Sequence, residues 1–266
     1  MSRRKQKYPV SNEQQQKSFL KSLHPKNPAQ EQYINHLTES KICFCIGPAG
    51  TGKTYIASNI ALQKLYDGDV QRILVTRPLV ATEDIGYLPG TLEEKIHPYL
   101  LPLLDAFEDH VGVAKTKELL EHGMIEASPL AFMRGRSLNN AFIILDEAQN
   151  VTKEQMKMFL TRIGYNTVLA INGDSTQTDL PNKSDCGLSW AVERLTGVSK
   201  DIAVVEFSRG DIVRNPLIET MLMHLESPNG TFVRPEVTDM TSRRRMNGNG
   251  SSKTLQTPAL LNSASR

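Results

Sequence analysis

The chain has 266 residues, enough to bury one hydrophobic core and consistent with one or two domains. Hydrophobic residues make up 39% and charged residues 23%, which is typical of a folded globular protein and excludes a fibrous or wholly disordered chain. No apolar run approaches the roughly 20 residues that span a bilayer, and the start MSRRKQKYPV lacks the apolar core of a secretion signal. We therefore expect a cytoplasmic protein without a membrane partner.

The net charge of +2 is unevenly distributed along the chain. Residues 1–28 carry seven Lys and Arg against one acid, residues 29–227 carry 18 against 26, and residues 228–266 carry six against two. Basic ends favour a polyanionic partner, although solvated, disordered tails have the same composition. We expect a basic arm over 1–23, a folded domain over 24–227 and a disordered basic tail over 228–266.

In chain order, short apolar runs alternate with segments of helical period. The predicted strands are Ile42–Ile46, Ile73–Thr76, Ala141–Leu145, Val168–Ile171 and Ile202–Val205. The predicted helices are Ser11–Leu23, Lys53–Leu65, Leu92–Phe107, Lys115–His122, Lys153–Arg162, Gly187–Leu195 and Pro216–Leu225. Short continuous apolar strands separated by helices predict an α/β fold, a doubly wound and mostly parallel sheet with helices on both faces.

A glycine-rich loop follows the first predicted strand and precedes a predicted helix. It reads Gly47-Pro48-Ala49-Gly50-Thr51-Gly52-Lys53-Thr54, the pattern G-x-x-x-x-G-K-[ST]. Glycines let the backbone approach a ligand, and its N–H groups and the helix N-terminus bind phosphate oxygens. We predict that these eight residues bind ATP, that Lys53 contacts the β- and γ-phosphates, and that Thr54 ligates Mg²⁺. A purely structural turn is the alternative, which the strand–loop–helix context disfavours.

Two acids, Asp146 and Glu147, end the apolar strand Ala141–Leu145. Asp146 can hold Mg²⁺ through the water bound to it, and Glu147 can polarise a water for in-line attack on the γ-phosphate. The pair favours a hydrolysing ATPase over a nucleotide kinase, which transfers the phosphate to a bound acceptor. Acids are also favoured at a helix N-terminus, so the prediction depends on the phosphate loop upstream.

Polar residues also follow the last two predicted strands. In Ile171-Asn172-Gly173-Asp174-Ser175-Thr176-Gln177, Gln177 is a candidate sensor of the γ-phosphate or the attacking water, and a plain turn is the alternative. In the segment over 208–216, Arg209 and Arg214 are candidates for stabilising charge in the transition state. Either arginine could instead be an ordinary surface residue.

Six blocks, in one order over roughly residues 24–226, resemble the PhoH-like ATPase family, including its compact members that are common in phages. The blocks are GPAGTGKTYIA, GYLPGTLEEKIHPYLLPLLDAF, MRGRSLNNAFIILDEAQN, FLTRIG, GDSTQTDLP and GDIVRNPLI. The resemblance implies one RecA-like P-loop NTPase core, akin to half of a superfamily 1 helicase, that binds and hydrolyses ATP. For a phage-encoded member, the compartment would be the host cytoplasm.

The resemblance extends upstream to Asn27-Pro28-Ala29-Gln30 with Tyr33, and by analogy with helicases Gln30 would contact the adenine edge. One departure is Asn215, where the family often has His after the arginine. Some relatives carry a fused nuclease-type domain. This chain has neither the length nor the clustered acids for one, so we do not expect ribonuclease activity.

Related helicases bind ATP between two RecA-like domains, whereas this chain has room for one. A neighbouring copy could complete the site head-to-tail, which closes into a ring where the rotation permits. We expect a homo-oligomeric ring, a hexamer by the family resemblance, with Arg209 or Arg214 acting in trans. The Pro-containing segment over 86–107 would be a subunit contact, a pore lining or a packing insertion.

Three functions remain open from the sequence. The first is an ATPase, a translocase or helicase, whose cycle acts on RNA or single-stranded DNA, as the basic ends and the Arg134-Gly135-Arg136 turn suggest. Against it, aromatic residues make up only 6% and form no stacking platform. The second is an ATP-controlled assembly or regulatory module without a nucleic-acid substrate. The third is a kinase for a small molecule or protein.

Overall fold

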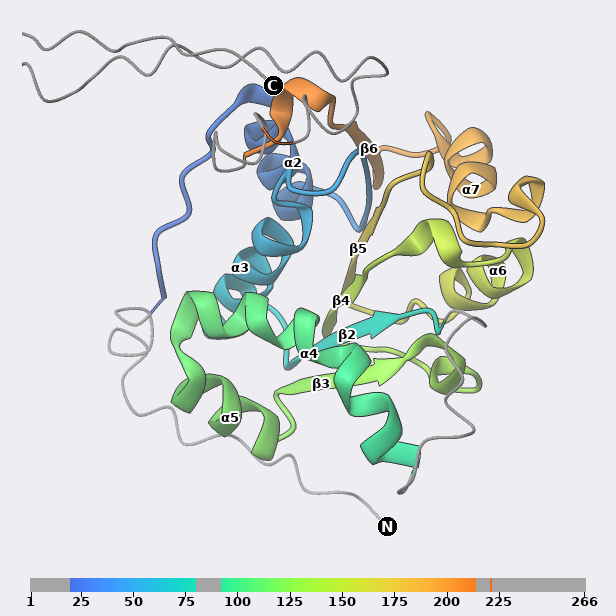
Figure 1. Cartoon of the computed structure of the whole chain (residues 1–266). Helices are drawn as coiled ribbons and strands as arrows, with labels where there is room; N and C mark the ends of the chain where they lie inside the picture. The colour runs from blue at the N-terminus through green and yellow to red at the C-terminus, as the bar shows by residue number, and fades with distance from the viewer. Residues whose placement is uncertain (1–19, 80–91, 214–220, 222–266) are drawn as a thin grey trace, which may run out of the picture. The chain divides into compact units, whose positions relative to one another are not determined.

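Six parallel strands form one sheet in the order β3-β2-β4-β5-β1-β6 in the computed structural model, which describes residues 20–79, 92–213 and 221 (Figure 1). The strands are β1 (Ile42–Ile46), β2 (Arg72–Arg77), β3 (Ile125–Pro129), β4 (Ala141–Leu145), β5 (Thr167–Gly173) and β6 (Ile202–Glu206). Every pairing is parallel. The carboxyl ends of β1, β4 and β5, which are neighbours in the sheet, therefore meet at one edge.

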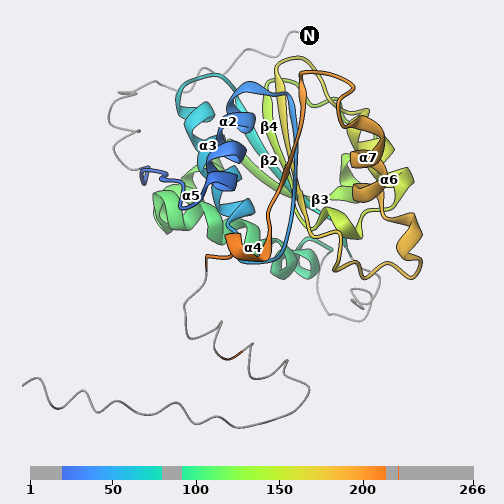
Figure 2. The same ribbon diagram turned by 90° about the horizontal axis from the view of Figure 1, so that it is seen from above.

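Helices cover both faces of this sheet. One face carries α2 (Pro28–Glu39), α3 (Lys53–Tyr66), α4 (Leu92–Val111) and α5 (Val113–Glu121). The opposite face carries α6 (Lys153–Leu160) and α7 (Gly187–Leu195), as the view in Figure 2 makes clear. The predicted doubly wound α/β fold is confirmed.

The central strand β4 shows why its sequence is continuously apolar. Successive side chains of a strand point to opposite faces. Phe142 and Ile144 pack on the side of α3, whereas Ile143 and Leu145 pack with Phe159 of α6. All five residues of β4 are fully buried, as expected for a strand that is covered on both faces.

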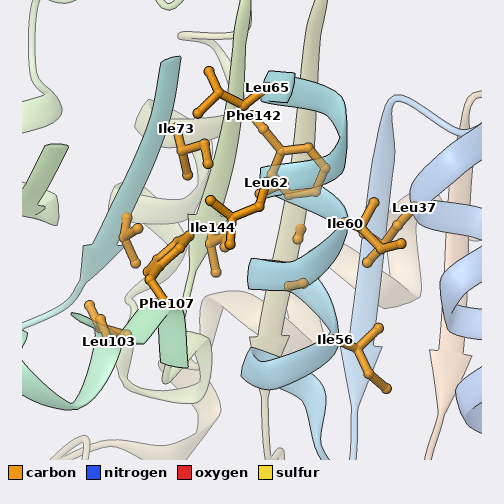
Figure 3. Packing of buried hydrophobic residues seen from close by; sticks show 14 of the residues in the cluster. Leu37, Ile56, Ile60, Leu62, Leu65, Ile73, Leu103, Phe107, Phe142 and Ile144 are labelled. Carbon is orange, nitrogen blue, oxygen red and sulfur yellow. The ribbon is translucent and has the colours of Figure 1, made fainter. Parts of the chain in front are cut away.

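The larger core lies between the sheet, α3 and α4. Figure 3 shows Ile73 of β2 and Phe142 of β4 beside Leu62 of α3 and Phe107 of α4. Fully burying a side chain of this size contributes roughly 1.5–3 kcal/mol. Leu103, one turn before Phe107, is 1% exposed in the same core. The described part of the Pro-containing segment over 86–107 therefore includes a packing element, and residues 80–91 lie outside the described residues.

The five predicted strands are confirmed with small changes at their ends, and α4 runs four residues beyond its predicted end at Phe107. The edge strand β3 was missed because IEASP has neither an apolar run nor strict alternation. Helix α2 was also missed, although its start is encoded: the Asn27 side chain accepts from the Gln30 N–H, and Pro28 follows.

Several predicted segments fall outside the described residues. They are the helix over 216–225, the tail over 228–266 and most of the arm over 1–23, of which residues 20–23 are not helical. All elements described above belong to the unit Met1–Asn215, whereas of the second unit, Pro216–Arg266, the structure describes only Met221. The domain boundaries stay predictions. No helix within the described ranges is both long and apolar enough to cross a membrane.

Candidate functional site

A cavity of about 300 Å³ lies where β1, β4 and β5 end. Its lining comes from three chain segments: the phosphate loop with the start of α3, the acids after β4, and the loop after β5. The lining residues are Ala49, Gly50, Gly52, Lys53, Thr54, Tyr55, Asp146, Glu147, Gln149, Gly173, Asp174 and Gln177. The parallel sheet thus brings together residues as far apart in the chain as Ala49 and Gln177.

The phosphate loop needs glycine at its first position. Gly47 has a φ of +151°, and a Cβ there would lie 2.5 Å from the carbonyl oxygen of Phe207. Gly52 precedes α3 in the left-handed conformation, with a φ of +88°. This conformation directs the chain from the loop into the first turn of α3, whose N-terminus carries a partial positive charge.

Lys53, the first residue of α3, reaches back over the loop. Its Nζ donates to the carbonyl oxygens of Gly47 at 2.7 Å and Pro48 at 2.8 Å. The ammonium group therefore lies above the loop and inside the cavity. Phosphate oxygens entering the cavity could replace these carbonyls as its acceptors.

Thr54 and Asp146 join the phosphate loop to the end of β4. The Thr54 hydroxyl donates to Oδ1 of Asp146 at 2.8 Å. Burial raises the pKa of Asp146 to about 6, with a smaller contribution from the neighbouring Glu147 carboxylate. A hydroxyl and a carboxylate are hard oxygen ligands of the kind that Mg²⁺ takes from a protein when substrate phosphates supply the others. The donor set therefore fits Mg²⁺.

Glu147 adopts the left-handed backbone conformation, with a φ of +53°. Its Oε2 accepts a hydrogen bond from Nε2 of Gln149 at 2.5 Å, and its Oε1 lies 3.7 Å from a guanidinium nitrogen of Arg77. Its side chain is 38% exposed. The carboxylate thus lines the cavity, held from one side and open to water on the other.

Gln177 lines the same cavity as Glu147. Its loop is ordered around Asp174, whose Oδ1 accepts from the backbone N–H and the hydroxyl of Thr176 at 3.0 and 2.6 Å. The Gln177 N–H donates to the carbonyl of Asp174 at 3.0 Å. The structure therefore places Lys53, Thr54, Asp146, Glu147 and Gln177 around one space.

Gln30 lies beside the loop but is not among the residues that line the cavity. Its Nε2 donates to the carbonyl of Thr51 at 2.9 Å, and its Oε1 accepts from the Lys26 N–H at 2.8 Å. Both ends of the amide thus bind backbone groups and tie α2 to the phosphate loop. The predicted contact with adenine stays a prediction.

The two arginines are not brought into the cavity. Arg209 is exposed on the short helix η5 (Arg209–Asp211) and is not among the lining residues, and Arg214 lies outside the described residues. Of the predicted Arg134-Gly135-Arg136 turn, Arg136 pairs with Glu126 of β3 through both terminal guanidinium nitrogens. This bond lowers the pKa of Glu126.

Sequence reasoning missed three residues at the site: Arg77, Gln149 and Tyr55. Gln149 is 3% exposed, and its two hydrogen bonds become visible only in the fold. A glutamine near a helical turn has no distinctive local pattern. Tyr55 packs against His110 of α4, with ring centroids 4.1 Å apart, and this pairing is equally invisible in the sequence.

Comparison with solved structures gives matches to helicases at low similarity. They include the crystal structure of DUF1998 helicase MrfA bound to DNA, with a TM-score of 0.39 and 15% identity, covering 68% of this chain and 25% of that chain. They also include the crystal structure of Pif1 helicase from Candida albicans, with a TM-score of 0.36 and 15% identity, covering 78% of this chain and 45% of that chain.

The sequence is similar to curated bacterial proteins. A PhoH-like protein of Bacillus subtilis is 46% identical over 210 residues, which cover 79% of this chain and 66% of the relative. A PhoH-like protein of Mycobacterium tuberculosis H37Rv is 48% identical over 203 residues, which cover 76% of this chain and 57% of the relative. Protein PhoH of Escherichia coli K12 is 44% identical over 200 residues, which cover 74% of this chain and 56% of the relative.

The match with this chain thus spans between 56% and 66% of the length of these relatives. A family model described as PhoH-like protein matches residues 22–226, which contain every residue of the cavity lining. The chain belongs to the PhoH-like protein family.

Proposed function

We propose that this chain is a magnesium-dependent ATPase whose active site is the cavity at the ends of β1, β4 and β5. The hydrogen bond between Thr54 and Asp146 is the observation that carries the proposal. It joins the phosphate loop to the acidic pair inside one cavity, so that a nucleotide bound by the loop would have its γ-phosphate near Glu147. Membership of the PhoH-like family supports the same class of site.

ATP binding would depend on the loop and the start of α3. The N–H groups of residues 47–54 would donate to phosphate oxygens, and the Lys53 ammonium would contact the β- and γ-phosphates. Thr54 and Asp146 would hold Mg²⁺, which neutralises part of the phosphate charge. Tyr55 lines the cavity next to these groups and is 39% exposed.

Hydrolysis would depend on Glu147 and Gln177. Glu147 would accept a proton from a water whose oxygen attacks the γ-phosphorus. The bond from the γ-phosphorus to the bridging oxygen breaks, and ADP leaves with the electron pair. Gln177, on the loop after β5, would orient the water or the γ-phosphate. No acceptor other than water is needed for this scheme.

A second copy of the chain would complete the site. Among the described residues that line the cavity, Lys53 alone is a cation. Arg209 is exposed outside the cavity of its own chain. An arginine supplied by a neighbouring copy would add the missing charge, and a repeated head-to-tail contact of this kind closes into a ring. We propose a ring, with six copies by the family resemblance.

We further propose that the ATPase cycle acts on RNA or single-stranded DNA. The basic ends support this substrate, because each Lys or Arg that neutralises a phosphate adds to the affinity. Phe132 and Arg134, two residues apart in the chain after β3, are both exposed, and aromatic rings and cations are the groups that bind a single strand. An ATP-controlled assembly module is the alternative.

The deciding experiment measures steady-state ATP hydrolysis with Mg²⁺, with and without single-stranded RNA or DNA. Hydrolysis that requires Mg²⁺ supports the ATPase. Stimulation by a single strand supports the nucleic-acid substrate, whereas an unchanged rate favours the assembly module. Label transferred from γ-labelled ATP to an acceptor other than water would identify a kinase and overturn the proposal.

A further inference from the structure

One buried amide connects the acidic pair after β4 to the loop after β5. Gln149 lies on the short helix η3 (Ala148–Asn150), directly after Glu147, and is 3% exposed. Its Nε2 donates to Oε2 of Glu147 at 2.5 Å, and its Oε1 accepts from the backbone N–H of Asp174 at 3.0 Å. The nitrogen and the oxygen of one side-chain amide therefore connect the ends of the neighbouring strands β4 and β5.

The orientation of this amide is fixed by its partners. If the amide were flipped, its oxygen would face the Glu147 carboxylate and its NH₂ would face the N–H of Asp174. The amide oxygen would then face another acceptor and the NH₂ would face another donor, so neither group would have a hydrogen-bond partner there. The donor must face Glu147, so Gln149 constrains where one carboxylate oxygen lies.

Gly173 makes room for the Gln149 amide at the end of β5. A Cβ at Gly173, the last residue of β5, would lie 2.8 Å from Oε1 of Gln149 and 3.0 Å from its backbone nitrogen. The absence of a side chain at residue 173 therefore lets the amide lie against the end of β5. From there Asp174 continues the connection, because its carbonyl accepts from the Gln177 N–H at 3.0 Å.

The Glu147 side chain is only partly buried, so its contacts with neighbouring side chains decide where its carboxylate lies. Glu147 is in the left-handed region with a φ of +53°, and its side chain is 38% exposed. Its other oxygen is 3.7 Å from Arg77, longer than a hydrogen bond. The hydrogen bond from Gln149 to Oε2 is shorter than the contact between Arg77 and Oε1. Oε1 of Glu147 can therefore accept a hydrogen bond from a water.

We propose that Gln149 is a positioning residue for ATP hydrolysis, which holds Glu147 and the loop carrying Gln177 at a fixed spacing around one water. The inference rests on the proposed ATPase function and deepens it. Gln149 would not bind the phosphates or Mg²⁺ itself. Its loss should therefore lower kcat while the affinity for nucleotide is retained.

The test compares three variants of the full chain at equal protein concentration. Gln149→Met keeps the length of the side chain and removes both hydrogen bonds. Gln149→Glu keeps an acceptor for the Asp174 N–H but places a second carboxylate against Glu147. Asn150→Ala is the matched control, because Asn150 lies on the same turn and its amide also bonds the loop after β5, at Asp179 at 3.0 and 2.8 Å, whereas Glu147 is bonded by Gln149.

We expect Gln149→Met and Gln149→Glu to lower kcat by about 10- to 100-fold, the value of a hydrogen bond to a charged group. Binding of a fluorescent ATP analogue should change by less than about threefold, and Asn150→Ala should stay within about threefold of the parent in kcat. If both Gln149 variants match the control, the proposal is overturned. It is also overturned if both lose nucleotide binding, because the role of Gln149 is then structural.

A double-mutant cycle tests whether Gln149 acts through Glu147. In the Glu147→Gln background, Gln149→Met should lower kcat by a much smaller factor than it does in the parent, because the carboxylate that Gln149 positions is gone. A fully multiplicative loss would overturn the proposal. If the parent itself does not hydrolyse ATP, the proposed function fails as well. If the parent is active and the Gln149 variants are equally active, only the role of Gln149 is overturned.

Discussion

The backbone N–H of Val213 donates to the carbonyl of Gly50, with the two atoms 2.9 Å apart. In the same segment, the carbonyl of Asp211 accepts from the side-chain amide of Asn27 at 3.3 Å. The residues after β6 therefore contact both the phosphate loop and the start of α2. These contacts fix the place of the segment that carries Arg209 relative to the phosphate loop.

Lys53→Ala and Glu147→Gln should fail in different ways. Loss of the ammonium group should weaken nucleotide binding by about 10- to 100-fold, because a charge-assisted contact to phosphate is removed. Glu147→Gln leaves the loop, Lys53 and Thr54 intact, so ATP should bind and remain unhydrolysed, with kcat lower by about 10²–10⁴-fold. Fluorescent-nucleotide binding and single-turnover hydrolysis separate the two effects. Near-parental hydrolysis by Glu147→Gln would show that another group is the base.

Gly47→Ala should damage the phosphate loop through a steric effect. The new Cβ would lie 2.5 Å from the carbonyl oxygen of Phe207, so β6 or the loop must move. We expect a loss of about 1–3 kcal/mol in unfolding free energy and weaker nucleotide binding. Gly210→Ala is the control, because its Cβ would meet only the Ser208 hydroxyl, at 3.5 Å. Equal melting temperatures for the two variants would contradict the prediction.

His110 should make the fold less stable in mild acid. Burial lowers its pKa, opposed in part by the hydrogen bond with the Tyr55 carbonyl and by Asp109, while Lys21 adds to the lowering. Its Nε2 donates to the carbonyl of Tyr55 at 2.8 Å, and its Nδ1 accepts from the amide of Asn59 at 3.0 Å. If Nδ1 were protonated, its N–H would face the N–H donor of the Asn59 amide, so the folded state disfavours the charged ring.

The unfolded chain binds that proton below about pH 6.5, so stability should fall as the pH drops from 7.5 to 5.5. Chemical unfolding of His110→Gln at both pH values should show a smaller fall than the parent. His24→Gln is the control, since His24 is exposed. A fall of the same size in both variants would assign the effect to other groups.

The sequence was sufficient for the parts of the site whose chemistry is local. The phosphate loop, Asp146, Glu147 and Gln177 follow apolar runs, and parallel strands bring such positions to one edge. The contacts of Gln149 and His110 depend on segments 25 to 55 residues away, which no local pattern encodes. Strand β3 was missed for a related reason: Glu126 faces Arg136 instead of a core and breaks the apolar pattern.

The tail over 228–266 should be dispensable for folding. It lies outside the described residues, and its composition predicts too little apolar surface to extend a core. A chain that stops at residue 227 should keep the melting temperature and the basal ATPase rate. If the tail binds nucleic acid by charge, truncation should also reduce the dependence of that affinity on salt concentration. An unchanged salt dependence would make the tail a solvated appendage.

The final prediction concerns activity shared between copies of the chain. An arginine finger is typically worth about 10³–10⁵ in turnover, and none lies among the described residues of the cavity lining. If a neighbour supplies it, the specific ATPase activity should rise with protein concentration as rings form. Sedimentation in the same concentration range should show the assembly. A fully active monomer would exclude the ring.

Mixing two inactive variants tests the direction of this contact. Glu147→Gln keeps the arginines, and Arg209→Ala or Arg214→Ala keeps the base, so a mixed interface can combine an intact base with an intact finger. In a random one-to-one ring about a quarter of the interfaces have this composition, so about a quarter of the parental rate should return. Lys200→Ala, which removes an exposed cation elsewhere, should be active by itself. If mixed rings form and neither mixture recovers activity, no arginine acts across the interface, and Arg209 and Arg214 lose their proposed role.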